Sequence, residues 1–188
     1  MTGFIFAFIA ALLAGIGARD QLTVAGLAAR NGQRVGLLAV AALCAAITGV
    51  IAGWAAGLVL PLLEGNTRAG QILLAVALCF AGTEMLALGA KPPPAEPTQS
   101  LGATAIVLAA HQLTDAARFF IFAIAAASAA PIPAGAGGAV GGIAVVSLGW
   151  IAAEDMPVKL ASMVRRGLGG LALVLAVWFA LQGLGRLG

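Results

Sequence analysis

Long apolar runs separated by short polar segments dominate this chain. Six runs cover approximately residues 4–29, 35–60, 69–90, 101–130, 134–153 and 167–184. Each approaches or exceeds the roughly 20 residues that a helix needs to cross the hydrocarbon core of a bilayer. Backbone groups in lipid must be satisfied within their own segment, and the alternating ten-residue strands of a membrane barrel are absent. The pattern therefore predicts an all-α fold, a polytopic membrane helical bundle of about six transmembrane helices.

Composition supports this prediction. Hydrophobic residues make up 62% of the chain and charged residues 9%, whereas soluble domains average about 45–50% and about 25%. The 26 glycines favour close packing between helices in lipid. Cys44 and Cys79 lie inside apolar runs without metal-ligand spacing, so both are predicted to pack in the core. No Lys or Arg precedes Arg19, which favours a permanent first helix over a signal peptide.

A proline-rich segment at 91–100 divides the chain almost in half. Four of its residues are proline, which cannot continue a helix and favours an extended linker. The predicted organisation is a three-helix repeat at 1–90, the linker at 91–100, and a second three-helix repeat at 101–188. An odd number of spans per repeat places the two repeats in opposite orientations. Such inverted repeats are typical of secondary transporters, whose substrate site lies near the midplane.

The basic residues predict the orientation. Six lie in the segments between runs one and two, three and four, and five and six, against two on the opposite side: Arg30, Arg34, Lys91, Lys159, Arg165 and Arg166, against Arg68 and Arg186. The positive-inside rule places the first group in the cytoplasm and both termini outside it. The membrane would be the inner (plasma) membrane in a bacterium. Topology thus accounts for the net charge of +3, and no nucleic-acid partner is expected.

Charged residues inside the apolar runs are the main functional signal. Arg19 and Asp20 lie in run one, and His111, Asp115 and Arg118 lie in run four. A charge at the bilayer centre costs at least ~2.5–3.5 kcal/mol, so these side chains should face the bundle interior and have partners. The i, i+4, i+7 spacing in run four would place its three residues on one helix face. We predict cross-pairing of Arg19 with Asp115 and of Asp20 with Arg118, the alternative being a static ion-pair network.

These residue types suit the binding of an ion. Asp20 and Asp115 are the candidate cation or proton ligands, and they are also the candidate metal ligands. The side chains of Gln21, Gln112 and Thr114 would supply neutral groups to the same site. Arg19 and Arg118 would act as charge partners, and His111 would serve a proton relay because imidazole titrates near pH ~6.5. Glu84, near the end of run three, is expected to snorkel toward the interface.

The first-run stretch Ala-Gly-Ile-Gly-Ala-Arg-Asp-Gln-Leu at 14–22, followed by Leu-Ala-Ala-Arg at 27–30, resembles a known family. It is similar to the GDT family of small membrane proteins, related to the Golgi manganese/calcium–proton antiporters. That family carries E-x-G-D-[KR]-[TS]-Q on the first helix of each of two three-helix repeats. The resemblance covers the whole chain in layout and about fifteen residues in motif.

The motif is degenerate in this chain. Aligned on its glycine at Gly17, Gly15 stands at the motif's Glu, Ala18 at its Asp and Asp20 at its Thr or Ser. In the second repeat His111 falls at the Glu position. A shift that matches Asp20 with Asp115 is the alternative register, and the sequence leaves both open.

The resemblance implies a secondary transporter of the divalent cation/proton antiporter type for manganese or calcium, with its site between the first helices of the two repeats. Hard cations prefer several oxygen ligands. The lost carboxylates favour a transport-inactive scaffold or partner protein as the alternative, and the arginines favour a small exporter of another ion or an amino-acid-like solute. An enzyme is not expected, since G-x-S-x-G and H-E-x-x-H motifs are absent. Expected partners are the bilayer and a small ion, without a resident cofactor; a homo-oligomer is left open.

Overall fold

The computed structural model describes residues 1–87, 100–155 and 157–186, apart from the side chain of residue 154. Within these residues the fold is entirely helical and no strand occurs, so the all-α prediction is confirmed. The elements are α1 (Thr2–Gly15), α2 (Arg19–Asn31), α3 (Val35–Leu63), α4 (Thr67–Ala87), α5 (Leu101–Leu113), α6 (Ala116–Ala127), α7 (Pro131–Ala152), the 3-10 turn η1 (Ala153–Asp155) and α8 (Val158–Gly183).

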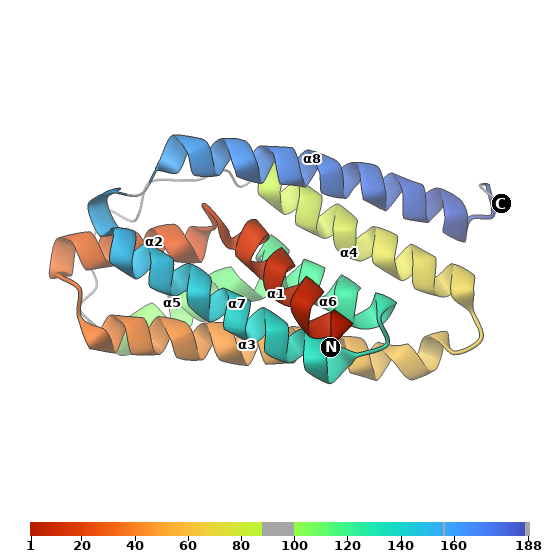
Figure 1. Cartoon of the computed structure of the whole chain (residues 1–188), viewed down its shortest axis with the longest axis horizontal. Coiled ribbons are helices and arrows are strands. Elements are labelled where there is room, and N and C mark those ends of the chain that lie inside the picture. The colour runs from red at the N-terminus through yellow and green to blue at the C-terminus, as the bar shows by residue number, and fades with distance from the viewer. Residues whose placement is uncertain (88–99, 156, 187–188) are drawn as a thin grey trace.

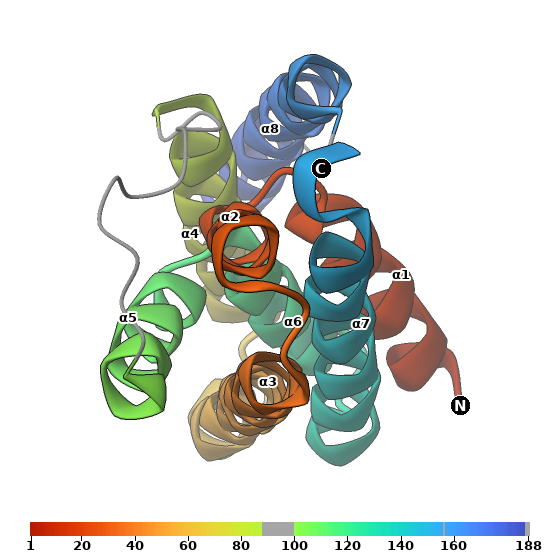
Figure 2. The ribbon, with the colours of Figure 1, turned by 90° about the vertical axis from the view of Figure 1, so that its left-hand side faces the viewer.

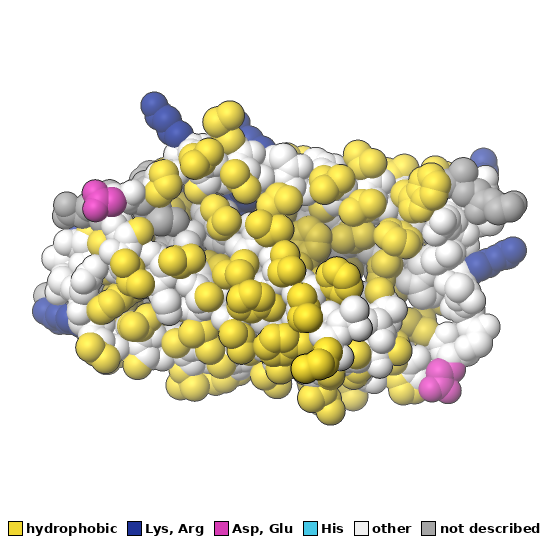
Figure 3. All heavy atoms as spheres, in the orientation of Figure 1, with side chains coloured by type: hydrophobic (Ala, Val, Ile, Leu, Met, Phe, Trp, Pro, Cys, Tyr) yellow, Lys and Arg dark blue, Asp and Glu magenta, His cyan; other side chains and the backbone are white. Residues whose placement is uncertain are grey.

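The long helices α3, α4, α7 and α8 run broadly along the long axis of the molecule, whereas α1 crosses it obliquely (Figure 1). In the described chain, α3, α4, α7 and α8 are each long and apolar enough to cross a membrane, and the number of spans reaches six if each of two bent helix pairs counts as one. On the face shown in Figure 3, apolar side chains cover the middle and charged side chains gather toward the ends. Large apolar side chains such as Trp54 and Val174 are 62% and 66% exposed. An outer surface of this kind suits lipid, because soluble proteins rarely expose large apolar patches.

Runs one and four are each broken near the middle, which corrects the expectation of continuous helices. The axes of α1 and α2 differ by 59°, and those of α5 and α6 by 51°. At the first break Gly17 has φ +72°, a conformation that glycine adopts without steric cost. At the second break Asp115 caps the N-terminus of α6, since its side chain accepts a hydrogen bond from the amide of Ala117. His111 and Arg118 therefore lie on different helices rather than on one face.

Small residues bring the other helices close together, as predicted from the glycine content. A Cβ atom placed on Gly53 of α3 would lie 2.6 Å from the Cα of Gly135 on α7. A Cβ on Gly82 of α4 would lie 2.8 Å from the carbonyl oxygen of Gly169 on α8. Seen from the end in Figure 2, α6 is at the centre, and it contacts α1, α3, α4 and α7. Residues at the start of α6 are therefore placed inside the bundle.

Several helix boundaries and side-chain environments in the structure differ from the prediction. Helix α8 begins at Val158, nine residues before the predicted start of run six, so Arg165 belongs to a helix rather than to a loop. Helix α3 continues through Pro61 to Leu63. Cys79 is exposed on the outer surface instead of packing in the core, and Cys44 is partly buried. The linker at 91–100 lies outside the described residues except for Ser100.

Candidate functional site

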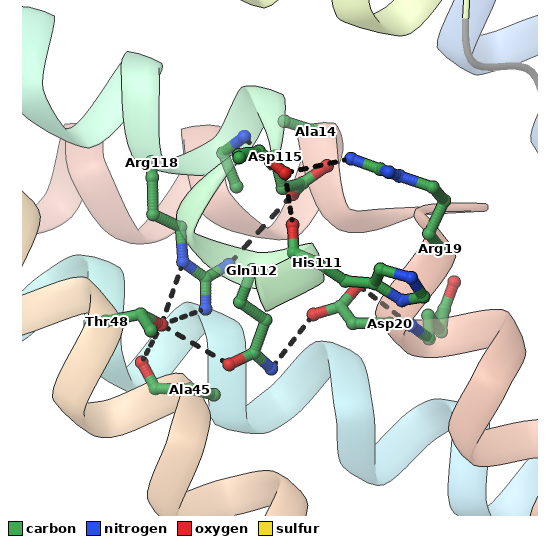
Figure 4. A network of polar contacts seen from close by, with 12 residues as sticks. Ala14, Arg19, Asp20, Ala45, Thr48, His111, Gln112, Asp115 and Arg118 are labelled. Carbon is green, nitrogen blue, oxygen red and sulfur yellow. Dashed lines mark hydrogen bonds and ion pairs between the residues drawn. The ribbon is translucent and has the colours of Figure 1, made fainter. Parts of the chain in front are cut away.

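A cluster of polar side chains surrounds the two helix breaks, and we call it the central polar cluster. It comprises Arg19 and Asp20 of α2, Thr48 of α3, Glu84 of α4, His111 and Gln112 of α5, Thr114 and Asp115 of the second break, Arg118 of α6 and Arg165 of α8. Figure 4 shows part of this network from close by. Of the residues predicted for a site, all but Gln21 contribute a side chain to the cluster.

Asp20 is a buried carboxylate held by neutral groups. Its side chain sits in the first turn of α2 and the residue is 3% exposed. One carboxylate oxygen accepts from the backbone amide of Gln21 at 2.8 Å, and the other accepts from Nε2 of Gln112 at 3.1 Å. Among the described residues no Arg, Lys or His nitrogen lies within 4.0 Å of this carboxylate. Asp20 is therefore a buried acid without a direct ion pair.

Arg118 does not pair with Asp20, contrary to prediction. Its Nε and Nη2 atoms donate to the hydroxyl of Thr48 at 3.0 and 2.7 Å. That hydroxyl lies 3.3 Å from Oε1 of Gln112, whose amide nitrogen binds Asp20, so Thr48 and Gln112 separate the two charges (Figure 4). Thr48 was missing from the predicted site because a single threonine in an apolar run resembles any other packing residue.

Arg165 occupies the centre of the charged network, although sequence reasoning assigned it to a loop. It is 1% exposed. Its Nη1 donates to the carbonyl oxygen of Ala14 at 2.8 Å, and its Nη2 donates to Oδ1 of Asp115 at 3.1 Å. The same Nη2 also forms an ion pair with Oε2 of Glu84. One sequence signal could have placed Arg165 in a helix. The residues before it are mainly apolar, which allows α8 to begin before residue 167.

The neighbours of Glu84 overturn two expectations. Glu84 is 7% exposed, so it does not snorkel to the interface. Its Oε1 lies 3.7 Å from Nε of Arg19, which therefore faces Glu84 instead of forming the predicted pair with Asp115. Asp115 instead lies 4.0 Å from Nη1 of Arg118, in addition to its contact with Arg165.

One edge of the cluster is accessible. The Arg19 side chain is 24% exposed, and its Nη2 donates to the hydroxyl of Thr114, itself exposed, at 3.1 Å. His111 lies nearby and is partly buried, with Nδ1 lacking a hydrogen-bond partner. The Gln21 side chain points elsewhere: it accepts from the amide of Gly17 at 2.8 Å and donates to the carbonyl of Val145 at 3.2 Å. Gln21 thus fixes the first break against α7.

Formal charges within the cluster balance, with three arginines and three acids. Four buried polar atoms nevertheless lack a hydrogen-bond partner: Nε of Arg19, Oε1 of Glu84, Nδ1 of His111 and Nε of Arg165. In the described part of the chain, no three His, Cys, Asp or Glu side chains are grouped so that they could hold a metal ion. A mainly apolar cavity of about 360 Å³ adjoins the cluster between α3, α4 and α6, with Thr48 and Arg118 in its lining.

Comparison with known proteins adds no family assignment. No protein-family model, curated protein or solved structure matches the chain. The resemblance to the GDT family therefore depends on the degenerate motif and the helix layout.

Proposed function

We propose that this protein is a secondary transporter that exchanges a small cation for protons, with Asp20 as the coupling carboxylate. The observation that carries the proposal is the environment of Asp20, which is 3% exposed and receives hydrogen bonds from neutral donors. An ionised carboxylate buried without a cation is costly in a low-dielectric interior. Binding a proton or a metal cation relieves that cost, and alternation between the two is an antiport cycle.

The helix breaks support a midplane site between inverted repeats. Broken helices whose ends meet near the middle of the bilayer are a common way to build a transporter site. Ala18 and Asp115, the N-caps of α2 and α6, have similar extended conformations, with φ/ψ of −67°/156° and −85°/149°. Aligning the two repeats on these caps matches Ala18 with Asp115, and both then stand at the position of the motif's Asp. This register differs from the two that the sequence leaves open. The first repeat would then have Ala18 in place of the motif's Asp, with Asp20 two residues later.

The accessible edge supplies a route for protons. His111 and Arg19 are partly buried residues near Asp20 at this edge, and Nδ1 of His111 has no hydrogen-bond partner (Figure 4). We propose that His111 relays protons to Asp20. Divalent manganese or calcium is the favoured cargo on the family resemblance, with the carboxylate oxygens of Asp20 as its ligands. Gln112 would join them by turning its amide oxygen, which faces Thr48 in the structure, toward the cation.

Loop charges support both termini lying outside the cytoplasm. Arg34 accepts a hydrogen bond from Trp150 through its carbonyl, so the α2–α3 turn and the end of α7 share one end of the molecule. That end also carries the start of α8 with Lys159, whereas Arg68 lies beside Gly185 at the other end. Arg165 no longer counts in this comparison because it is buried.

A second candidate function is export of a small anionic or amino-acid-like solute. The cavity of about 360 Å³ that adjoins Arg118 and Thr48 favours it. Sites for small molecules are typically mainly apolar with a few placed polar groups. A transport-inactive scaffold remains the alternative to both.

The test is flux into liposomes that contain the purified protein and a cation-sensitive dye. With a proton gradient imposed, Mn²⁺ or Ca²⁺ should enter with wild-type protein, and Asp20→Asn should reduce entry to the rate of protein-free liposomes. Asp155→Asn, which changes an exposed acid outside the cluster, is the matched control and should transport normally. Equal flux by Asp20→Asn refutes the coupling role. Absence of wild-type flux for both cations refutes cation antiport and favours the other candidates.

A further inference from the structure

The guanidinium of Arg165 occupies a position where oxygen atoms from α1, α4 and the second helix break converge. We propose that this guanidinium is a tethered counter-cation that fills a second cation site, and that a divalent cation binds there when Arg165 moves out. The site consists of the carboxylates of Glu84 and Asp115 and the carbonyl oxygen of Ala14. The inference depends on the proposed function only in taking the substrate to be a cation.

The contacts of Arg165 define the site. Its Nη2 contacts one carboxylate oxygen of Glu84 and one of Asp115, so both oxygens point at a single nitrogen atom. Its Nη1 donates a hydrogen bond to the carbonyl oxygen of Ala14 at 2.8 Å. Carboxylates and backbone carbonyls are the ligands that proteins offer to calcium and related hard cations.

The first helix break makes the Ala14 carbonyl available. Helix α1 ends at Gly15, and the last carbonyls of a helix lack donors from their own helix. These carbonyls also carry the negative end of the helix dipole, which favours a cation. A continuous first helix would have used this oxygen within its own backbone ladder.

Unsatisfied atoms around Arg165 give an independent indication. Oε1 of Glu84 is buried and has no hydrogen-bond partner, although Nε of Arg19 lies 3.7 Å away and is itself unpartnered. Nε of Arg165 is also buried without a partner. Most buried polar groups in native proteins are hydrogen-bonded. The guanidinium therefore leaves part of the ligand capacity of Glu84 unused, and a metal cation could use both oxygens.

Release of Arg165 would also change how the helices are held. Its side chain joins α8 to the end of α1, to α4 and to the start of α6. A cation that takes over the three oxygens leaves α8 without these bonds. Cation binding is thereby linked to movement of α8 relative to the helix breaks, the kind of coupling that alternating access requires.

Removal of the tethered cation should raise cation affinity. The apparent affinity of a site that is vacant in only a fraction of molecules is reduced by that fraction. With the vacant state at ~1–10% of the population, Arg165→Gln should bind Mn²⁺ ~10–100-fold more tightly than wild type. Arg166→Gln is the matched control, because Arg166 is the adjacent residue in the sequence and is exposed.

Binding is measured on the purified protein in detergent by electron paramagnetic resonance of free Mn²⁺. We expect tighter binding in Arg165→Gln, wild-type binding in Arg166→Gln, and loss of the gain when Glu84→Gln is added to Arg165→Gln. Binding by Arg165→Gln that is no tighter than wild type would overturn the inference. A gain that survives Glu84→Gln would overturn it as well.

Thermal unfolding covers the case in which Arg165→Gln is too unstable for binding measurements. Mn²⁺ should raise the unfolding midpoint of Arg165→Gln more than that of wild type. The shift for Arg165→Lys should be intermediate. Equal shifts of the midpoint in all three proteins contradict the inference. The outcomes separate the two proposals. Tight binding by Arg165→Gln without wild-type flux leaves the second site standing and refutes transport, whereas flux without tighter binding refutes only the second site.

Discussion

Replacing Arg165 with methionine should destabilise the protein through its carboxylate partners. The substitution keeps an unbranched side chain at a position that is 1% exposed and removes the charge. Glu84 and Asp115 lose their closest cation, and the carbonyl of Ala14 loses a donor. Arg19 stays 3.7 Å from Glu84, a distance without a hydrogen bond.

The free-energy costs of losing a hydrogen bond and of stranding a buried charge differ enough to identify the cause. Interhelical hydrogen bonds in membrane proteins average only ~0.6 kcal/mol. Stranding one partner of a buried ion pair costs about 3–5 kcal/mol. We therefore expect Arg165→Met to lower the free energy of unfolding by about 3–5 kcal/mol. Arg166→Met, an exposed substitution, should change it by less than about 0.5 kcal/mol.

The assay is reversible unfolding in mixed micelles with increasing sodium dodecyl sulfate, followed by the fluorescence of the three tryptophans. The double variant Arg165→Met/Glu84→Gln should regain part of the loss, because the stranded charge at Glu84 is then neutral. A loss below about 1 kcal/mol, the size of an ordinary hydrogen bond, would refute the reasoning. So would a double variant whose two losses simply add.

Two further predictions test the packing and the membrane-facing surface. Gly53→Leu should destabilise the fold by about 1–3 kcal/mol or more in the same unfolding assay, because its Cβ would lie 2.6 Å from the backbone of α7. Gly70→Leu is the control, since a Cβ at Gly70 meets nothing within 4 Å. Equal losses of stability in the two variants would contradict the close contact. In single-tryptophan variants, brominated lipids should quench Trp54 and Trp178, which are 62% and 52% exposed, more strongly than the partly buried Trp150, and equal quenching would argue against these surfaces facing lipid.

Hydrophobic patterning was sufficient to predict the helices but not the breaks within them. Lipid imposes one rule on every apolar run, that its backbone bonds be made internally, so each run predicts a helix from its own residues. The breaks near Gly17 and Asp115 involve no proline and follow no local rule of that strength. At the second break the capping contact of Asp115 lies within the sequence, yet an aspartate in an apolar run fits equally well with an unbroken helix that carries a buried charge.

Local sequence also identified where charges enter the membrane, because burying a charge is costly wherever the helix is placed. Asp20, Asp115 and Arg118 were therefore predicted as site residues, and the structure places all three in the central polar cluster. Which charged side chains pair with one another could not be predicted in this way. Arg165 reaches Glu84 across 81 positions of sequence and Asp115 across 50, distances over which no spacing rule operates. Only the packing of α8 against α4 beside the first break brings Arg165 to these acids, and it leaves Asp20 as the buried carboxylate without a direct ion pair among the described residues.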